Sequence, residues 1–232
     1  MHRDPRIQRD RRSFLGALAA LGGVTLIRPS IVGAESALAP ASSGEGVAHH
    51  TKPWDLSWLD ALAGKHRQVF DVGALEPGGS PLHVVSNYLD AHREVFGLVY
   101  PDVNTLVGIA FSAFPINASD ALWKTYALGT RWKIKDPGTG DWATHNIFAS
   151  APAASPAANE TVGALQRRGT IFWQCNNALG GIARQLADDL QRPVDEVRAE
   201  LVAGLLPGVK LVPAHTMVLG LAQEHGCTYE RV

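Results

Sequence analysis

One cysteine stands where an apolar strand would end and a helix would begin. Cys175 closes the apolar run 170–175, and Asn176 and Asn177 follow it at the expected start of a helix. The unpaired N–H groups and the positive end of that helix favour the thiolate, which is the nucleophilic form of cysteine. Either asparagine could cap the helix, and we expect both to border a ligand site. The alternative, from position alone, is an inert buried cysteine, because free cysteines are among the most buried residues.

His215 is the second candidate for chemistry, because it follows the expected strand 209–213. The carboxyl ends of parallel strands meet at one edge of a sheet, which would bring His215 near Cys175. An imidazole within reach of the thiol could deprotonate it. The alternative is a helix-start residue that faces water, and position alone favours this alternative somewhat. Two ligands do not make a metal site, and nothing in the sequence brings His145 to join them, so we predict no metal and no cofactor.

The other cysteine, Cys227, opens the expected last strand. In a parallel sheet this start lies at the edge opposite to Cys175. A disulfide requires the two Cα atoms to lie within about 7 Å of each other. We therefore predict that no disulfide joins the two cysteines and that Cys227 has a structural role.

The elements that must position these residues alternate between strand and helix over residues 53–232. Such alternation predicts a single α/β domain with a mostly parallel sheet and helices on both faces. The alternation of strands and helices stops over 129–160, and a loop this long is usually functional or disordered. Trp132 and Trp142 flank a turn in it and could line a pocket. The expected strands are 67–72, 105–111, 170–175, 209–213 and 227–230, and the expected helices are 81–96, 117–128, 162–168, 176–190, 194–205 and 216–225.

The first 34 residues have the three parts of a signal peptide: a basic start, an uncharged stretch over 13–27 and small residues up to Ala34. The pair Arg11-Arg12, followed by Ser-Phe-Leu, resembles the twin-arginine export signal. About 15 uncharged residues are too few for a bilayer span, which needs roughly 20. We therefore predict export to the periplasm, cleavage after Ala34, and no stable membrane span afterwards, rather than a poor membrane anchor or a basic amphipathic helix. Residues 35–52 would form a flexible leader.

Removal of the signal changes the charge of the remaining chain. Residues 1–34 hold six arginines and two aspartates, so cleavage changes the formal net charge from −1 to −5. The remaining chain has no basic cluster suited to a nucleic-acid backbone, and we predict no nucleic-acid partner.

The segment from Gly169 to the C-terminus resembles the second half of a DsrE/DsrF-like domain. The matching motifs are a strand that ends in cysteine (168–179), a Pro-Gly-Val turn into a strand (205–214), and a Gln-x-x-Gly before a closing strand (222–229). Residues 69–128 fit the first half of that domain more loosely. The resemblance covers roughly residues 66–231, and no single motif would suffice to establish it.

This resemblance implies a small α/β sandwich, usually a homo-oligomer, several of whose members carry sulfur as a cysteine persulfide. Cys175 stands at the carrier position. We therefore expect an exported sulfur carrier or thiol-redox protein, which would require a sulfur-donor or redox partner protein. The alternative is a non-catalytic periplasmic oligomer that binds a small ligand or metal, which the loop 129–160 and His215 suggest. A third interpretation is a scaffold whose oligomer is the functional unit.

Overall fold

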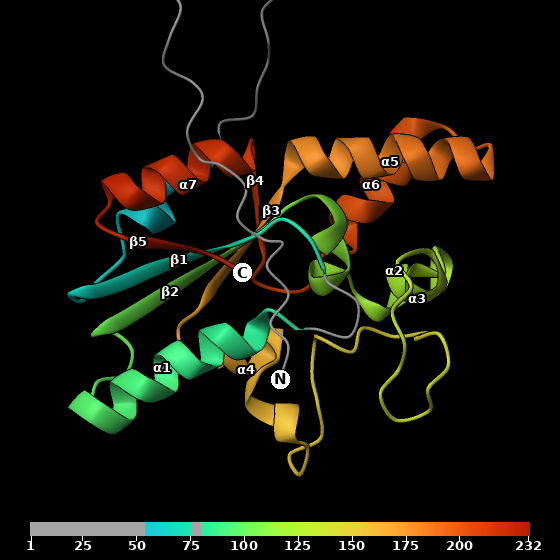
Figure 1. Cartoon of the computed structure of the whole chain (residues 1–232). Helices are drawn as coiled ribbons and strands as arrows, with labels where there is room; N and C mark the ends of the chain where they lie inside the picture. The colour runs from blue at the N-terminus through green and yellow to red at the C-terminus, as the bar shows by residue number, and fades with distance from the viewer. Residues whose placement is uncertain (1–53, 76–79) are drawn as a thin grey trace, which may run out of the picture. The chain divides into compact units, whose positions relative to one another are not determined.

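The computed structural model describes residues 54–75 and 80–232 (Figure 1). The expected signal peptide 1–34 and leader 35–52 lie outside the described residues. A five-stranded sheet in the order β4-β3-β2-β1-β5 forms the centre, and all neighbouring strands are parallel. The α/β class, with a parallel sheet and helices on both faces, is therefore confirmed.

The strands follow the expected order along the chain, with small shifts at their ends. All seven residues of β2 are buried, as expected for a central strand that is covered on both faces. This strand stops at Ile109, before the expected end, because Phe111 adopts a left-handed φ of 45° and starts a 3-10 helix. The strands are β1 (His66–Val72), β2 (Val103–Ile109), β3 (Ile171–Cys175), β4 (Lys210–Val212) and β5 (Thr228–Arg231).

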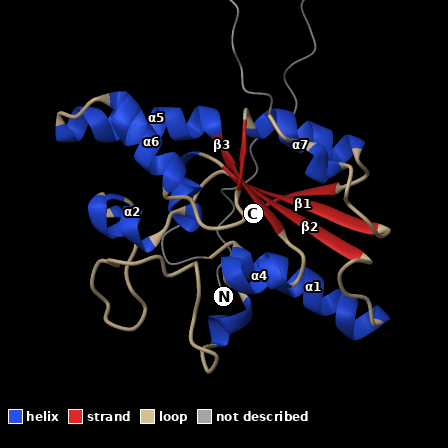
Figure 2. Ribbon diagram, turned by 180° about the vertical axis from the view of Figure 1, so that it is seen from behind, coloured by secondary structure: helices blue, strands red, loops and turns tan. Residues whose placement is uncertain are grey.

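The helices form a layer on each face of the sheet. Figure 2 shows α7 on one face and α1 with α4 on the other, while α5 and α6 lie beside the sheet beyond β3. Within the described ranges, no helix combines the length and apolar character that a membrane span requires. The helices are α1 (Leu82–Phe96), α2 (Asp120–Thr125), α3 (Leu128–Arg131), α4 (Val162–Arg167), α5 (Asn176–Leu190), α6 (Val194–Ala203) and α7 (His215–Glu224).

The position of α7 follows from the strand order. The chain proceeds outward from β1 through β2 and β3 to β4, and α7 then returns it across the sheet to β5, beside β1. Because parallel crossovers are right-handed, a connection that returns in the opposite direction covers the opposite face. This return places the start of α7 at the carboxyl ends of the central strands, next to the end of β3.

Alternating side chains of the strands build two apolar cores. Val69, Leu106 and Trp173 face α7 and pack with the segment around Trp58. Their neighbours along the strands pack against the opposite layer, and these include Phe70, Val107 and Phe172.

The prediction of a single helix over 117–128 is wrong in its extent. The structure divides this stretch into α2 and α3, because Ala127 adopts a left-handed conformation (φ 48°, ψ 48°). Tyr126, just before the break, is buried, and its hydroxyl hydrogen-bonds to Glu200 of α6. The break therefore accompanies a contact with a residue 74 positions away, which no local pattern could reveal.

The segment 129–160 is anchored by a buried asparagine. The side-chain amide of Asn146 donates to the backbone oxygens of Ile116 (3.0 Å) and Ala118 (2.6 Å). Its side-chain oxygen accepts a hydrogen bond from the N–H of Phe148 (2.8 Å). These bonds hold the middle of the segment against the 3-10 helix Phe111–Asn117, which lies at the carboxyl end of β2.

Candidate functional site

The sulfur of Cys175 lies at the meeting point of two helix N-termini. Its Sγ accepts the backbone N–H of Ala178 in the first turn of α5 (3.4 Å). It also accepts the backbone N–H of His215, the first residue of α7 (3.3 Å). Cys175 is buried, with 5% of its surface exposed. Two backbone donors and the positive ends of two helices therefore meet at this sulfur.

The asparagines that follow Cys175 do not cap α5. Cys175 itself occupies the N-cap position, and its sulfur takes the role that an oxygen usually has. The side chain of Asn176 turns toward α6, where its Oδ1 accepts from Arg198 (2.5 Å). Asn177 borders the pocket described below. Of the two asparagines predicted at the site, only Asn177 therefore lines it.

The imidazole of His215 is buried and fully hydrogen-bonded. The indole N–H of Trp173 donates to His215 Nδ1 (3.1 Å), and Nε2 lies 2.7 Å from Asp71 Oδ1. Because an indole can only donate, Nδ1 must be the acceptor, which assigns the proton to Nε2 and directs it at Asp71. The prediction of a water-facing histidine is therefore wrong, since only 6% of the residue is exposed.

This network also bears on the expectation that the imidazole acts as base for the thiol. Both ring nitrogens of His215 are engaged with Trp173 and Asp71, so neither is available to take the proton of Cys175 in this arrangement. What reaches the sulfur is the backbone N–H of His215. The structure thus brings the two predicted residues together, but through the main chain of His215.

Asp71 and Trp173 are the two residues of this network that the sequence analysis did not identify. Asp71 lies near the carboxyl end of β1, and its Oδ2 accepts the hydroxyl of Tyr229 on β5 (2.7 Å). Its hydrogen bond to this carboxylate raises the pKa of Tyr229, and burial adds to the increase. An acidic side chain within the run Val-Phe-Asp-Val was the signal available in the sequence.

Gly108 of β2 provides the space in which Trp173 and His215 meet. A Cβ at this position would contact the indole ring of Trp173 and lie 2.7 Å from Cε1 of His215. Such close packing excludes every side chain larger than hydrogen. The glycine is therefore part of the support of the site.

Cys175 opens on a pocket of about 780 Å³. One wall is a face of α5 that carries Asn177 and Gly181, and another comes from Trp132. At the pocket, Phe111 is 68% exposed in a left-handed conformation, a kind of strain that concentrates at functional sites. The other lining residues are Ser112, Arg131, Ala178, Ile182, Gln185, Ala214, His215 and Thr216.

The remaining loop residues named in the sequence analysis lie elsewhere. Trp142 does not line this pocket; it is exposed, and the ammonium of Lys135 lies 5.5 Å from its ring. His145 is half-exposed, lies 3.7 Å from Asp136, and does not line this pocket. No three His, Cys, Asp or Glu side chains gather as a metal-binding group in the part of the chain that the structure describes.

Both cysteines are free thiols, and they lie at opposite edges of the sheet, as expected: Cys175 ends β3, whereas Cys227 precedes the start of β5. Cys227 directly precedes β5 and is packed with the core under α7. Burial raises the pKa of the Cys227 thiol, and Arg67 offsets part of the increase. An unreactive structural cysteine fits these surroundings.

Fold and site together define an α/β protein with a buried, doubly hydrogen-bonded cysteine at the carboxyl edge of a parallel sheet. No protein-family model matches the chain, and no curated protein sequence matches it. Among solved structures, the chain is similar to a protein of unknown function, MTH1491 from Methanobacterium thermoautotrophicum. The identity is 16%, the TM-score is 0.38, and the alignment covers 72% of this chain and 99% of that one. A likeness this distant carries no functional argument.

Proposed function

We propose that this chain is an exported DsrE/DsrF-like protein in which Cys175 carries sulfur or redox equivalents. One observation carries the proposal: Cys175 Sγ accepts N–H bonds from the first turns of both α5 and α7, at the wall of a large pocket. Reactive cysteines are found in such surroundings, at helix N-termini. The motifs of residues 168–229 support the family assignment.

The sulfur-transfer step would require a persulfide donor, R–S–SH. The Cys175 thiolate attacks the outer sulfur of the donor, a new S–S bond forms at Sγ, and the S–S bond of the donor breaks. The departing sulfur takes up the proton of the donor and leaves as R–SH, while Cys175 becomes a persulfide anion. The pocket of about 780 Å³ leaves room for the added sulfur and for part of the donor.

The test is to treat the purified protein with cysteine persulfide and to locate the added sulfur by mass spectrometry of peptides. We expect one extra sulfur atom on Cys175 in the native protein and in Cys227→Ser. The variant Cys175→Ser should gain none. Absence of added sulfur on Cys175, or its appearance on Cys227 alone, would contradict the proposal.

The second candidate function is binding of a small ligand without chemistry. The observation that favours it is the pocket itself, because Arg131 and Trp132 form part of its lining beside His215. Native mass spectrometry with metal analysis of the purified protein would test this function. Ligand binding is supported if a bound molecule is found with the native protein and with Trp142→Ala but not with Trp132→Ala. Trp142 serves as the control because it lies outside the pocket. An empty protein, unchanged by His215→Ala, counts against it.

We also propose that the chain forms a homo-oligomer, as the family resemblance implies. Large apolar side chains are exposed at the C-terminal end of α1, among them Val95 and Phe96. Such exposure is typical of surfaces that bind another protein. Native mass spectrometry measures the number of subunits directly, and a monomer at micromolar concentration would refute this part of the proposal.

A further inference from the structure

A second pocket lies at the edge of the sheet opposite to Cys175, where the strands begin. Its volume is about 390 Å³, and residues of α1 and the segments before β2 and β3 enclose it. Three arginines line it: Arg93, Arg167 and Arg168. The rest of the lining is Leu89, Val99, Tyr100 and Asn159, so it contains no carboxylate.

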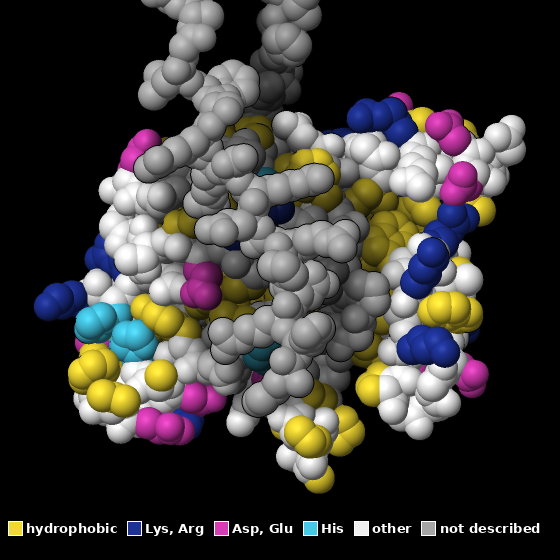
Figure 3. Space-filling model, in the orientation of Figure 1, with side chains coloured by type: hydrophobic (Ala, Val, Ile, Leu, Met, Phe, Trp, Pro, Cys, Tyr) yellow, Lys and Arg dark blue, Asp and Glu magenta, His cyan; other side chains and the backbone are white. Residues whose placement is uncertain are grey.

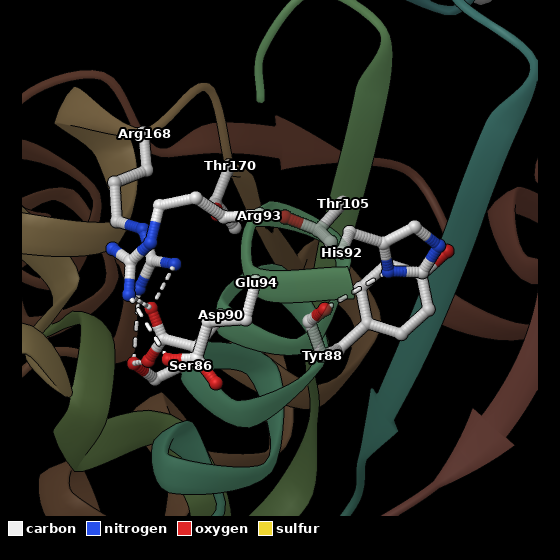
Figure 4. Close-up of polar contacts among 9 residues, drawn as sticks. All are labelled: Ser86, Tyr88, Asp90, His92, Arg93, Glu94, Thr105, Arg168 and Thr170. Carbon is white, nitrogen blue, oxygen red and sulfur yellow. Dashed lines mark hydrogen bonds and ion pairs between the residues drawn. The ribbon is translucent and has the colours of Figure 1, made fainter. Parts of the chain in front are cut away.

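Two of the three guanidinium groups are held by Ser86 and Asp90 of α1 (Figure 4). Arg168 donates through Nη1 to Ser86 Oγ (3.0 Å) and through Nη2 to Asp90 Oδ1 (2.8 Å). Arg93 Nη2 lies 3.0 Å from the same carboxylate oxygen, and Ser86 donates to the other oxygen of Asp90 (3.2 Å). Ser86 is 2% exposed, and neither it nor Asp90 lines the pocket. These groups therefore orient the guanidinium groups from outside the pocket.

The charges around the pocket do not cancel. Asp90 is shared between Arg93 and Arg168, and the exposed Glu94 lies 3.5 Å from Arg93 alone. Arg167 makes no ion pair with any residue in the described ranges. A guanidinium group has five N–H donors, so the three arginines keep unused donors at the pocket. The pocket is thus a cationic site on a chain whose part after residue 34 has a formal charge of −5.

Apart from Asn159, the remainder of the wall is largely apolar and partly held in place. Leu89 is buried, whereas Val99 and Tyr100 are more than half exposed. The ring of Tyr100 lies against Gly169, where φ is +90° and an added Cβ would contact the ring. Leu89, Val99 and Tyr100 therefore leave room for a body of low polarity beside the arginines. The hydrophobic and histidine side chains that Figure 3 shows at the lower left, over the C-terminal end of α1, form a separate surface, because no histidine lines the pocket.

From this combination we infer that the pocket binds a small organic oxyanion: a carboxylate, phosphate or sulfonate group on an apolar body. Arginine pairs with these groups through two parallel N–H bonds, and the orientation fixed by Asp90 reduces the ordering cost of binding. A volume of about 390 Å³ lies within the range of small-molecule sites. This site is independent of the function proposed for Cys175.

The test is a calorimetric titration of the full chain with phenyl phosphate, compared with inorganic phosphate and benzyl alcohol. We expect phenyl phosphate to bind at least about tenfold more tightly than either, because only it satisfies both the arginines and the apolar wall. Arg167→Gln should weaken its binding about tenfold. That side chain is exposed and unpaired in the described structure, so the substitution should leave the fold intact. Arg184→Gln, an exposed arginine of α5 outside both pockets, is the matched control and should bind as the native protein does.

The inference would be overturned if Arg167→Gln and the native protein bound phenyl phosphate with equal affinity. It would also be overturned if the native protein bound benzyl alcohol as tightly as phenyl phosphate. Equal affinity for inorganic phosphate would overturn the part that concerns the apolar body. The proposal for Cys175 is tested by a different measurement, the mass spectrometry of peptides after treatment with cysteine persulfide. Either proposal can therefore fail without the other.

Discussion

Asp71 and Trp173 are linked to the sulfur of Cys175 through His215. They hydrogen-bond to the two ring nitrogens of His215, and the main-chain N–H of the same residue reaches Cys175 Sγ. Because the proton on Nε2 is directed at Asp71, loss of that carboxylate leaves a buried donor without a partner. At the scale of single residues, the surroundings of Cys175 therefore include side chains that do not touch its sulfur.

Asp71→Ala should lower the free energy of unfolding by about 1–3 kcal/mol, the usual cost of a buried unsatisfied donor. It should also slow the reaction of Cys175 with iodoacetamide, because the N–H of His215 is no longer held in place. Urea unfolding and the rate of alkylation, both in a Cys227→Ser background, measure the two effects. Asp71→Asn should restore much of both, since an amide oxygen still accepts from Nε2. An unchanged rate of alkylation in folded Asp71→Ala would show that the network does not act on the sulfur.

Gly108→Ala should destabilise the protein by about 1–3 kcal/mol, because the new methyl group overlaps the Trp173 ring and displaces His215. Urea unfolding again provides the measurement. Gly220→Ala in α7 is the matched control, because nothing lies within 4 Å of its added Cβ. It should be neutral or stabilising by about 0.5–1 kcal/mol, as expected for alanine in a helix. Equal effects of the two substitutions would argue against a steric role for Gly108.

At the scale of elements, a polar contact joins the α2–α3 break to α6. Glu200 accepts the hydroxyl of Tyr126 and two N–H groups of Arg192 (2.6 and 3.1 Å). These bonds, that of Arg192 first, lower the pKa of Glu200 to about 2 from 4.5. Burial and the same carboxylate raise the pKa of Tyr126 to about 12. The contact links α6 to the residue that precedes the break.

The lowered pKa of Glu200 predicts a dependence of stability on pH. The native state binds fewer protons at this group than the unfolded state, so its contribution is fully present above pH 4.5 and is lost as the pH falls toward about 2. Glu200→Gln should therefore be less stable than the native protein at about pH 5, and the difference should shrink by about pH 3. Urea unfolding at both pH values measures it. A difference that does not change with pH would refute the assignment.

At the scale of the whole molecule, export remains a proposal that rests on residues 1–34. Replacement of Arg11 and Arg12 by lysine should block translocation in a bacterial host with the twin-arginine pathway. Fractionation of cells measures the location, and N-terminal sequencing of the exported form should begin at Glu35. Export that is insensitive to the substitution, or a protein that keeps Arg11 and Arg12 after export, would contradict the proposal.

The sequence by itself predicted the features that depend on neighbours along the chain. Alternating apolar strands and helices gave the α/β class, and the helix after Cys175 has the predicted bounds, 176–190. Local patterns also placed Cys175 and His215 at one edge of a parallel sheet, because strand direction follows from the alternation. The break at Ala127 escaped prediction, since it accompanies a contact between Tyr126 and a distant helix.

Only the tertiary structure decided how the candidate site works. His215 meets Asp71 across 144 positions of sequence and Trp173 across 42, because α7 returns over the sheet and places its first residue above β1 and β3. Those partners occupy both ring nitrogens, so His215 serves the sulfur through its N–H. Hydrophobic periodicity records which side of an element is buried, but not which polar partners it meets there. For that reason the sequence located Cys175, and the fold determined its surroundings.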